Sequence, residues 1–146
     1  MNVEKSYTAE LFDCLRQMDG IYSAYAKSVG MNYTSMYIFY YISYTDGCTQ
    51  KSICEQLFLP KQTVNTIVKG FCQDGIVELA EAFDDRRQKT LHLTRKGQEL
   101  ADKILKKIDS AENASMEQFS VREKELFISI MKKYISVLAR EMRIKK

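Results

Sequence analysis

Polar side chains that can form hydrogen bonds with another molecule cluster in the stretch from Leu59 to Gly75. The apolar residues at positions 64, 67, 68 and 71 recur at helical spacing, so they would form the inner face of a helix. The outer face would then carry amide, hydroxyl and ammonium groups, with no carboxylate before Asp74. We call this outer set the polar face; its members are Lys61, Gln62, Thr63, Asn65, Thr66 and Lys69.

The composition of the polar face differs from that of a helix that only meets water, because solvated helices favour Glu, Lys and Ala. Its side chains have the reach and the donor–acceptor pattern to read base edges in the DNA major groove. Gln or Asn can form two hydrogen bonds with adenine, and each good pair is worth about 1–3 kcal/mol of discrimination. A helix N-terminus also attracts phosphate through its free N–H groups and its dipole. A merely polar surface is the alternative interpretation, because helix-turn-helix patterns are short and degenerate.

A concentration of positive charge follows between Asp84 and Lys96. Five basic residues minus two acidic residues give this segment a net charge of +3, which equals the net charge of the whole 146-residue chain. The rest of the chain therefore balances to zero, and the positive field is concentrated here. Arg86 and Arg87 at a loop tip can enter a narrow minor groove, where the negative potential is strongest. This segment favours DNA binding over the alternative of a solvated charged turn.

Catalytic and metal-binding chemistry finds little support in the sequence. The single histidine, His92, lies between Leu91 and Leu93 in a predicted strand, which would point it away from the core. No Ser/His/Asp order, metal-ligand cluster or Gly-rich phosphate loop accompanies it. We therefore expect neither an enzyme nor a protein that holds a metal or cofactor.

The four cysteines form no CxxC pair, and a disulfide framework is not expected in a chain without an export signal. Cys54 and Cys72 are predicted to be small core residues, since free cysteine is often buried. A redox-sensing thiol at Cys14 or Cys48 is the alternative, and it would require a lowered thiol pKa.

Two helices are predicted in the first 44 residues. Apolar residues recur every three or four positions from Leu11 to Val29, which indicates a long first helix that Gly30 could end. The segment 33–44 is apolar nearly all round and rich in aromatic residues, so it should form a second, mostly enclosed helix.

The remaining elements have recognisable start and stop signals. Thr49 is a plausible N-cap for a short third helix, Pro60 begins the polar helix in its first turn, and Gly75 ends it. After Gly75 the apolar period changes to that of two strands joined by a charged loop. Thr94 would cap the next helix, residues 113–118 would form a weakly patterned connection, and Ser120 with its capping box would begin the last helix.

The predicted order is four helices, a two-stranded hairpin and two helices, which is a mainly α fold containing a winged helix-turn-helix. Residues 33–109 would form the winged DNA-binding region, and residues 1–32 and 110–146 a helical dimerisation region. The last helix carries more apolar surface than a single contact needs, which favours burial against a second copy of the chain. Without a signal sequence or an apolar run long enough to span a bilayer, we expect a cytoplasmic protein with no membrane partner.

The sequence resembles the MarR family of bacterial transcriptional regulators over essentially its whole length. The motifs are TQKSICEQLFLPKQTVNTIVKGF and then GIVELAEAFDDRRQKTLHLTRKG, with the Asp85-Arg86-Arg87 tip and the Leu91-x-Leu93-Thr94-x-x-Gly97 exit of the wing. The resemblance implies a homodimer on a pseudo-palindromic DNA operator, usually a repressor that a small ligand or thiol oxidation releases. Two recognition helices in such a dimer lie about one DNA turn apart, roughly 34–36 Å.

The resemblance also implies roles for individual residues. The six residues of the polar face would contact the major groove. Arg87 would enter the minor groove, Asp85 would brace it through an ion pair, and Arg86 and Lys89 would add DNA contacts. Glu78-Leu79, Glu81 and Gly70 depart from the family pattern, which bears on affinity and target sequence rather than on how DNA is bound.

In this family, ligands bind in the cleft between the helical dimer region and the winged unit. A small aromatic effector would therefore meet Tyr22, Tyr25, Met31, Tyr33, Tyr37 and Tyr41. Ordinary core packing is the alternative for at least half of these side chains. A thiol-based redox regulator of the same fold and a winged protein-interaction module are the other functions to weigh.

Overall fold

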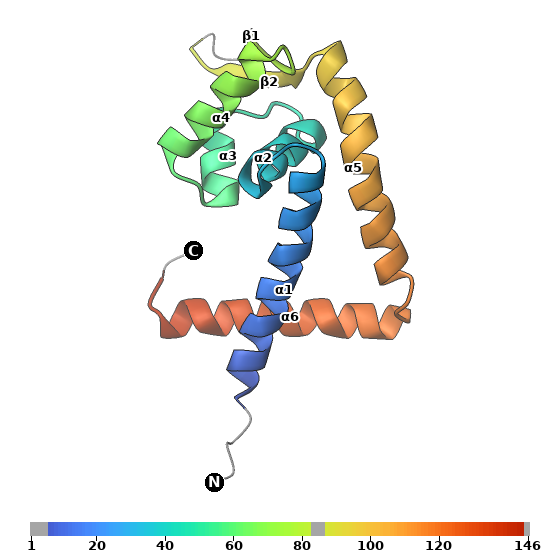
Figure 1. The fold of residues 1–146 in the computed structure, drawn as a ribbon. Helices are drawn as coiled ribbons and strands as arrows, with labels where there is room; N and C mark the ends of the chain where they lie inside the picture. The colour runs from blue at the N-terminus through green and yellow to red at the C-terminus, as the bar shows by residue number, and fades with distance from the viewer. Residues whose placement is uncertain (1–5, 83–86, 145–146) are drawn as a thin grey trace. The chain divides into compact units, whose positions relative to one another are not determined.

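The computed structural model describes residues 6–82 and 87–144, which form six helices and one two-stranded antiparallel sheet (Figure 1). The elements in chain order are α1 (Tyr7–Ser28), α2 (Tyr33–Tyr44), α3 (Gln50–Leu57), α4 (Lys61–Gln73), β1 (Val77–Glu81), β2 (Lys89–Leu93), α5 (Arg95–Met116) and α6 (Val121–Glu141). This is the predicted mainly α, winged helix-turn-helix architecture. The chain divides into two compact units, which end and begin within α5 at Leu105 and Lys106.

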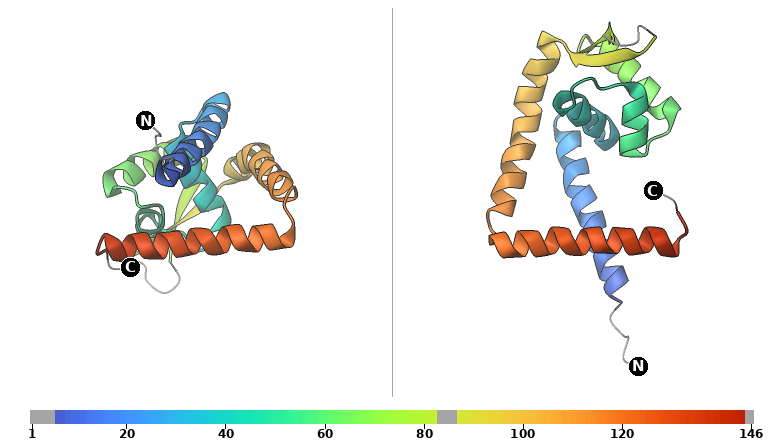
Figure 2. Two further views of the ribbon diagram at one scale, coloured as in Figure 1. Left: turned by 90° about the horizontal axis from the view of Figure 1, so that it is seen from below. Right: turned by 180° about the vertical axis from the view of Figure 1, so that it is seen from behind.

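The core of the first unit is built around α2. This helix contacts α1, α3 and β2, and Figures 1 and 2 show α2, α3 and α4 gathered next to the hairpin. Ile38 and Phe39 of α2 are completely buried. The Phe39 ring packs against Phe71 of α4 with 5.8 Å between ring centroids and a tilt of 58°, a geometry that aromatic pairs favour. The all-round apolar pattern of α2 therefore corresponds to an enclosed helix, as predicted.

The helix-turn-helix consists of α3 and α4. Thr49 caps α3 as predicted: its Oγ1 accepts a hydrogen bond from the Ser52 N–H at 3.0 Å, and Ser52 Oγ accepts one from the Thr49 N–H at 3.0 Å. Phe58 ends α3 in the left-handed conformation, with φ 54° and ψ 40°. Pro60 is the N-cap of α4 rather than a residue of its first turn, because its ψ of 140° is extended. The turn between the two helices is therefore short and its geometry is fixed.

The hairpin is attached to the segment that precedes α3. Strands β1 and β2 pair from Val77 opposite Leu93 to Glu81 opposite Lys89. Leu91 is buried, and its N–H donates to the Cys48 carbonyl oxygen at 2.7 Å. This bond ties the wing to the helix-turn-helix. His92 lies on the exposed face of β2, as the sequence predicts.

The start of α5 is bonded to the end of α4. Thr94 caps α5 by accepting a hydrogen bond from the Gly97 N–H at 3.1 Å, and its own N–H donates to the Ile76 carbonyl at 3.0 Å. Lys96 Nζ donates to the Asp74 carbonyl oxygen at 2.7 Å. A Cβ atom on Gly97 would overlap the carbonyl oxygen of Ile76, so only glycine allows this close approach.

Two helical glycines should therefore respond to alanine in opposite directions. Gly97→Ala is expected to lower the free energy of unfolding by about 1–3 kcal/mol, because the added methyl group must displace backbone. At Gly70 in α4 a Cβ would meet nothing within 4 Å, so Gly70→Ala should raise it by about 0.5–1 kcal/mol. Urea unfolding followed by circular dichroism measures both values. A loss of stability in Gly70→Ala, or none in Gly97→Ala, would contradict this account.

Helix α5 is longer than the sequence pattern indicates. It runs through Met116, so the connection predicted for residues 113–118 is wrong for its first four positions. Every residue from 113 to 116 is exposed, which removes the periodic apolar signal. Ala114 and Met116 are good helix formers, and helix propensity continues the helix where burial does not.

Helix α6 makes up most of the second unit and begins with the predicted capping box. The Ser120 N–H donates to Glu123 Oε2 at 2.8 Å, and Ser120 Oγ accepts from the Glu123 N–H at 3.3 Å. The hydrogen bonds from Ser120 hold the pKa of the Glu123 carboxyl below its ordinary value. No residue of α6 is buried in the single chain, although the helix is rich in Leu, Ile and Phe. Within the described residues, no helix is long and apolar enough to cross a membrane.

Candidate nucleic-acid interface

Helix α4 separates its apolar and polar residues as the sequence predicts. Val64, Val68 and Phe71 are buried, and Ile67 is half-buried, so they hold the inner face against the core. Five members of the polar face are exposed and the sixth, Thr63, is half-buried. The helix therefore presents amide, hydroxyl and ammonium groups on one exposed surface, without a carboxylate among them.

Gln50 is a residue of this surface that sequence reasoning missed. Asn65 Nδ2 donates to Gln50 Oε1 at 3.5 Å, which joins the polar face of α4 to the first residue of α3. This bond orients the Asn65 amide from its donor side and leaves its oxygen to accept from another group. The signal that could have found Gln50 is its place directly after the Thr49 cap, where α3 begins.

The backbone N–H groups at the N-terminus of α4 can bind an anion. Pro60 supplies no side-chain cap for the first turn. The first N–H groups of a helix have no partner within the helix, so an outside acceptor such as a phosphate oxygen can bond to them. Lys61, at the first position of the helix, adds a positive charge at the same end.

The basic residues of the wing segment differ in exposure and in ion pairing. Two residues of the predicted wing tip lie outside the described residues. They are Arg86, a predicted DNA contact, and Asp85, the predicted ion-pair partner of Arg87. Arg87 is exposed. Lys89 Nζ lies 3.3 Å from Glu81 Oε1, and both side chains are about half exposed. Lys89 is therefore partly neutralised, which the charge count missed because Glu81 lies outside the segment that was counted.

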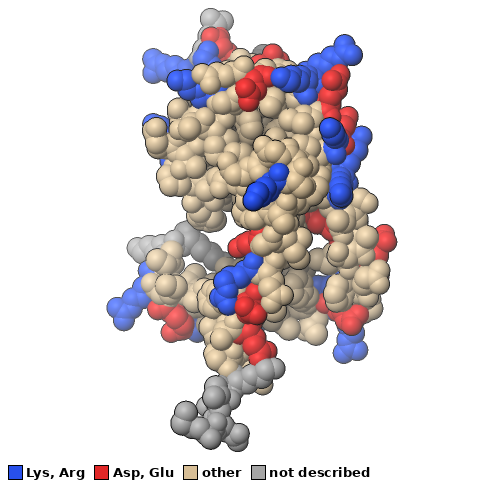
Figure 3. Space-filling view, in the orientation of Figure 1, with Lys and Arg blue, Asp and Glu red and all other residues tan. Residues whose placement is uncertain are grey.

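The other two basic residues, Arg95 and Lys96, form contacts at the start of α5. Arg95 forms an ion pair with Glu99 at 3.1 Å, and Lys96 bonds to the end of α4. Figure 3 shows positive side chains over the hairpin and the start of α5, with acidic side chains interspersed among them. Exposed ion pairs are worth at most about 1 kcal/mol, so phosphate oxygens can replace the carboxylates at little cost.

Three of the six predicted effector-site residues come together in a stack. The Tyr22 and Tyr33 rings lie 6.2 Å apart at 20°, and the Tyr33 and Tyr37 rings lie 6.0 Å apart at 7°. Burial raises the pKa of the Tyr33 hydroxyl, and the Asp19 carboxylate raises it further. Tyr33 therefore stays a neutral phenol, partly covered by its neighbours and with Asp19 beside it.

The other predicted effector residues have different surroundings. Tyr25 donates its hydroxyl to the Ile104 carbonyl at 2.8 Å, which gives it a structural role between α1 and α5. Met31 and Tyr41 are half-buried. The effector site stays a prediction, and the stack of Tyr22, Tyr33 and Tyr37 is the part of it with a defined geometry.

The cysteines are distributed differently from the expectation. Cys48, and not Cys54 or Cys72, is the completely buried thiol; the latter two are half-buried. The reason is tertiary, because the hairpin covers Cys48 through the bond from Leu91. Burial raises the pKa of the Cys48 thiol, although Ser52 lowers it in part. Cys14 is exposed.

These environments predict selective thiol chemistry. N-ethylmaleimide at neutral pH should modify Cys14 at least about tenfold faster than Cys48, because only the accessible thiolate reacts. Mass spectrometry of peptides measures both rates, and Cys14→Ser provides the control. Equal labelling of Cys48 in the folded protein would show that this site opens readily.

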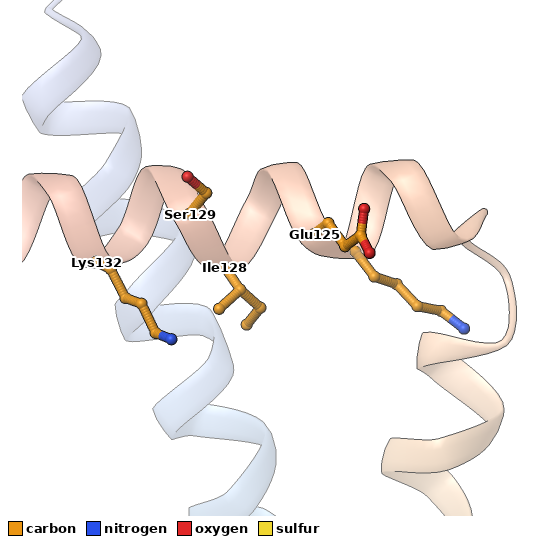
Figure 4. A pocket seen from close by; sticks show the side chains of 5 residues that line it. Glu125, Ile128, Ser129 and Lys132 are labelled. Atoms are coloured by element: carbon orange, nitrogen blue, oxygen red, sulfur yellow. The ribbon is translucent and has the colours of Figure 1, made fainter.

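Helix α6 carries a shallow depression lined by Lys124, Glu125, Ile128, Ser129 and Lys132. All five residues come from one helix (Figure 4), so they describe a helix surface and not an enclosed ligand site. Among residues 6–82 and 87–144, no group of three or more His, Cys, Asp or Glu side chains is placed to hold a metal ion.

Comparison with known proteins agrees with the fold. Residues 29–88, which include α2, α3 and α4, match the model of the MarR family. A search of curated proteins found no significant match. Among solved structures, the chain is similar to a MarR/EmrR family transcriptional regulator from Acinetobacter sp. ADP1, with 24% identity, 96% of this chain and 99% of that chain covered, and a TM-score of 0.75.

Two further structures have the same likeness. A MarR family regulator from Neisseria meningitidis has 22% identity and a TM-score of 0.79, with 94% of this chain and 97% of that chain covered. The S. aureus MepR–DNA complex has 20% identity and a TM-score of 0.74, with 92% and 99% covered. At these identities the likeness establishes the fold that the chain shares with them.

Proposed function

We propose that the protein is a sequence-specific, duplex-DNA-binding transcriptional regulator and not an enzyme. Residues 29–88 match the model of the MarR family, and the fold is that of MarR regulators. The observation that carries the proposal is the polar face of α4, exposed, free of carboxylates and held by a buried apolar inner face. The structure of S. aureus MepR, which has a similar fold, was solved in complex with DNA, and this supports the proposal.

The regulator acts as a homodimer on a pseudo-palindromic operator. The apolar surface of α6 supports this assembly, because Leu126, Phe127 and Ile130 are each more than half exposed in the single chain. Exposed apolar area of this extent is typical of a surface that a partner covers. A twofold partner would also supply the second recognition helix that a palindromic site requires.

Binding to duplex DNA at several salt concentrations tests the proposal. A protein that neutralises Z phosphates loses affinity with a log–log slope of about −0.9Z, so a steep slope on genomic fragments is expected. Selection of bound fragments from a genomic library supplies the duplex. Failure to bind any duplex at low salt would overturn the proposal and favour a winged protein-interaction module.

Arg87 and Gln62 should contribute to DNA binding in different ways. Arg87→Ala is expected to weaken binding to all duplexes and to make the salt slope shallower by about 1, because it removes a positive charge that would lie in the minor groove between the phosphates. Gln62→Ala should cost about 1–3 kcal/mol on the selected duplex only, because an amide reads base edges. Fluorescence anisotropy on selected and unrelated duplexes measures both. Equal losses on both duplexes for both variants would contradict this division.

The regulator is a repressor that a small aromatic compound releases from DNA. The stack of Tyr22, Tyr33 and Tyr37 supports a planar ligand, because a further ring can extend an existing stack. If titration with phenols and aromatic acids leaves operator affinity unchanged, the effector proposal is wrong. In the redox alternative, peroxide releases the DNA and Cys14→Ser abolishes the response; the exposed Cys14 fits this role better than the buried Cys48.

A further inference from the structure

Among the described residues, Phe58 is the most exposed of the large apolar side chains. It is 91% exposed, and its backbone is in the left-handed conformation with φ 54° and ψ 40°. In the described part of the chain, Arg143 is the one other non-glycine residue with positive φ. Core packing does not explain why an aromatic residue occupies this position, because the ring is exposed and the backbone conformation is strained.

The backbone at this position is required by the turn. The Phe58 N–H and the Leu59 N–H both donate to the Cys54 carbonyl, the latter at 3.2 Å, and this closes α3 before α4 begins. The residue that ends a helix in this way is usually glycine, because any Cβ raises the energy of the left-handed conformation. Phe58 therefore costs stability and returns almost none through burial.

Phe58 lies beside the start of the polar face. Three steps of about 3.8 Å separate its Cα from that of Lys61, so the two are at most about 11 Å apart. No acidic residue occurs from Gln56 to Gln73. Phe58 thus lies close to a positive helix N-terminus that can bond phosphate, in a segment whose charge favours a polyanion.

From these observations we infer that Phe58 is a DNA-contacting residue whose ring packs on the apolar parts of the duplex, the deoxyribose and thymine methyl groups beside the α4 contact. Apolar side chains, phenylalanine included, can contact the thymine methyl group in this way. The inference rests on the proposed function and adds an apolar contact from the α3–α4 turn to the polar contacts of α4.

A protein partner fits these observations less well. Protein interfaces need a central cluster of apolar residues that is removed from water. The neighbours Leu57 and Leu59 are half-buried, so Phe58 stands without such a cluster. A single ring is sufficient for a contact with a sugar or a methyl group.

The inference is tested by measuring how two variants of Phe58 and one of Lys61 bind a duplex that the wild-type protein has selected from a randomised pool. Phe58→Ala should weaken binding about tenfold and leave the salt slope unchanged, because no phosphate contact is lost. Lys61→Ala should instead make the slope shallower by about 1. Phe58→Gly should bind as weakly as Phe58→Ala while its unfolding temperature rises, because glycine relieves the left-handed backbone.

The loss of affinity together with gained stability separates a contact from a folding defect. If Phe58→Ala and Phe58→Gly bind the duplex as tightly as the wild type, the inference is overturned while the proposed function stands. If the wild type selects no duplex, the proposed function is overturned and the inference with it.

Discussion

Two glutamines in place of Leu126 and Ile130 are expected to convert the proposed homodimer into a monomer. Burying a whole Leu or Ile side chain is worth about 1.5–3 kcal/mol. Leu126 and Ile130 are 57% and 55% exposed in the single chain, so each contributes about half of that value, and the four side chains of the dimer together contribute about 3–6 kcal/mol. Glutamine keeps a high helix propensity, and no residue of α6 is buried in the single chain, so the helix itself should persist. Sedimentation velocity measures the change in mass.

The loss of the dimer should also reduce DNA binding. A monomer engages one half-site, so affinity for the selected duplex should fall at least about 100-fold. The matched control replaces Glu125 and Lys132 with glutamine, which keeps the net charge and changes side chains that line the depression on α6 (Figure 4). A dimer that survives the Leu126 and Ile130 changes would place the twofold contact elsewhere in the chain.

Phe39→Ala is expected to lower the free energy of unfolding by about 3–5 kcal/mol. The side chain is completely buried, and its ring contacts Phe71, so truncation leaves a cavity between α2 and the inner face of α4. Most small domains have only about 5–15 kcal/mol of stability, so a large part of it would be lost. Urea unfolding monitored by circular dichroism gives the value.

Phe58→Ala is the matched control for Phe39→Ala, because the same atoms are removed from a ring that is 91% exposed. Its stability should change by less than about 0.5 kcal/mol, since alanine keeps the left-handed strain and little burial is lost. Similar losses in both variants would show that the two rings are covered to a similar extent in solution.

Local signals in the sequence predicted the elements well. The bounds of α2 follow from its apolar pattern, and the caps at Thr49, Thr94 and Ser120 are those that the structure shows. These features depend on residues close in sequence, where backbone geometry allows few alternatives. The division of α4 into buried and exposed faces has the same origin, because it requires only helical spacing.

The features that the sequence did not predict all depend on residues far apart in the chain. Cys48 is buried because the hairpin covers it, and Lys89 is paired with Glu81 because the strand register places them opposite each other. The bond between Gln50 and Asn65 requires the packing angle of α3 on α4. Periodicity carries no information on register or packing angle, so these contacts could not be predicted from it. The same limit applies to the geometry of the predicted effector site.

The junction between α4 and α5 determines how a signal can travel within the first unit. Thr94 and Lys96 join the first turn of α5 to the backbone at and after the end of α4 through hydrogen bonds from the Thr94 N–H to the Ile76 carbonyl and from Lys96 Nζ to the Asp74 carbonyl. Gly97 adds a close contact with Ile76 that admits no side chain. A shift of α5 near Ile104, whose carbonyl accepts the Tyr25 hydroxyl, would be carried through these contacts to the backbone at the end of α4. The side chains proposed to meet the duplex lie on that helix.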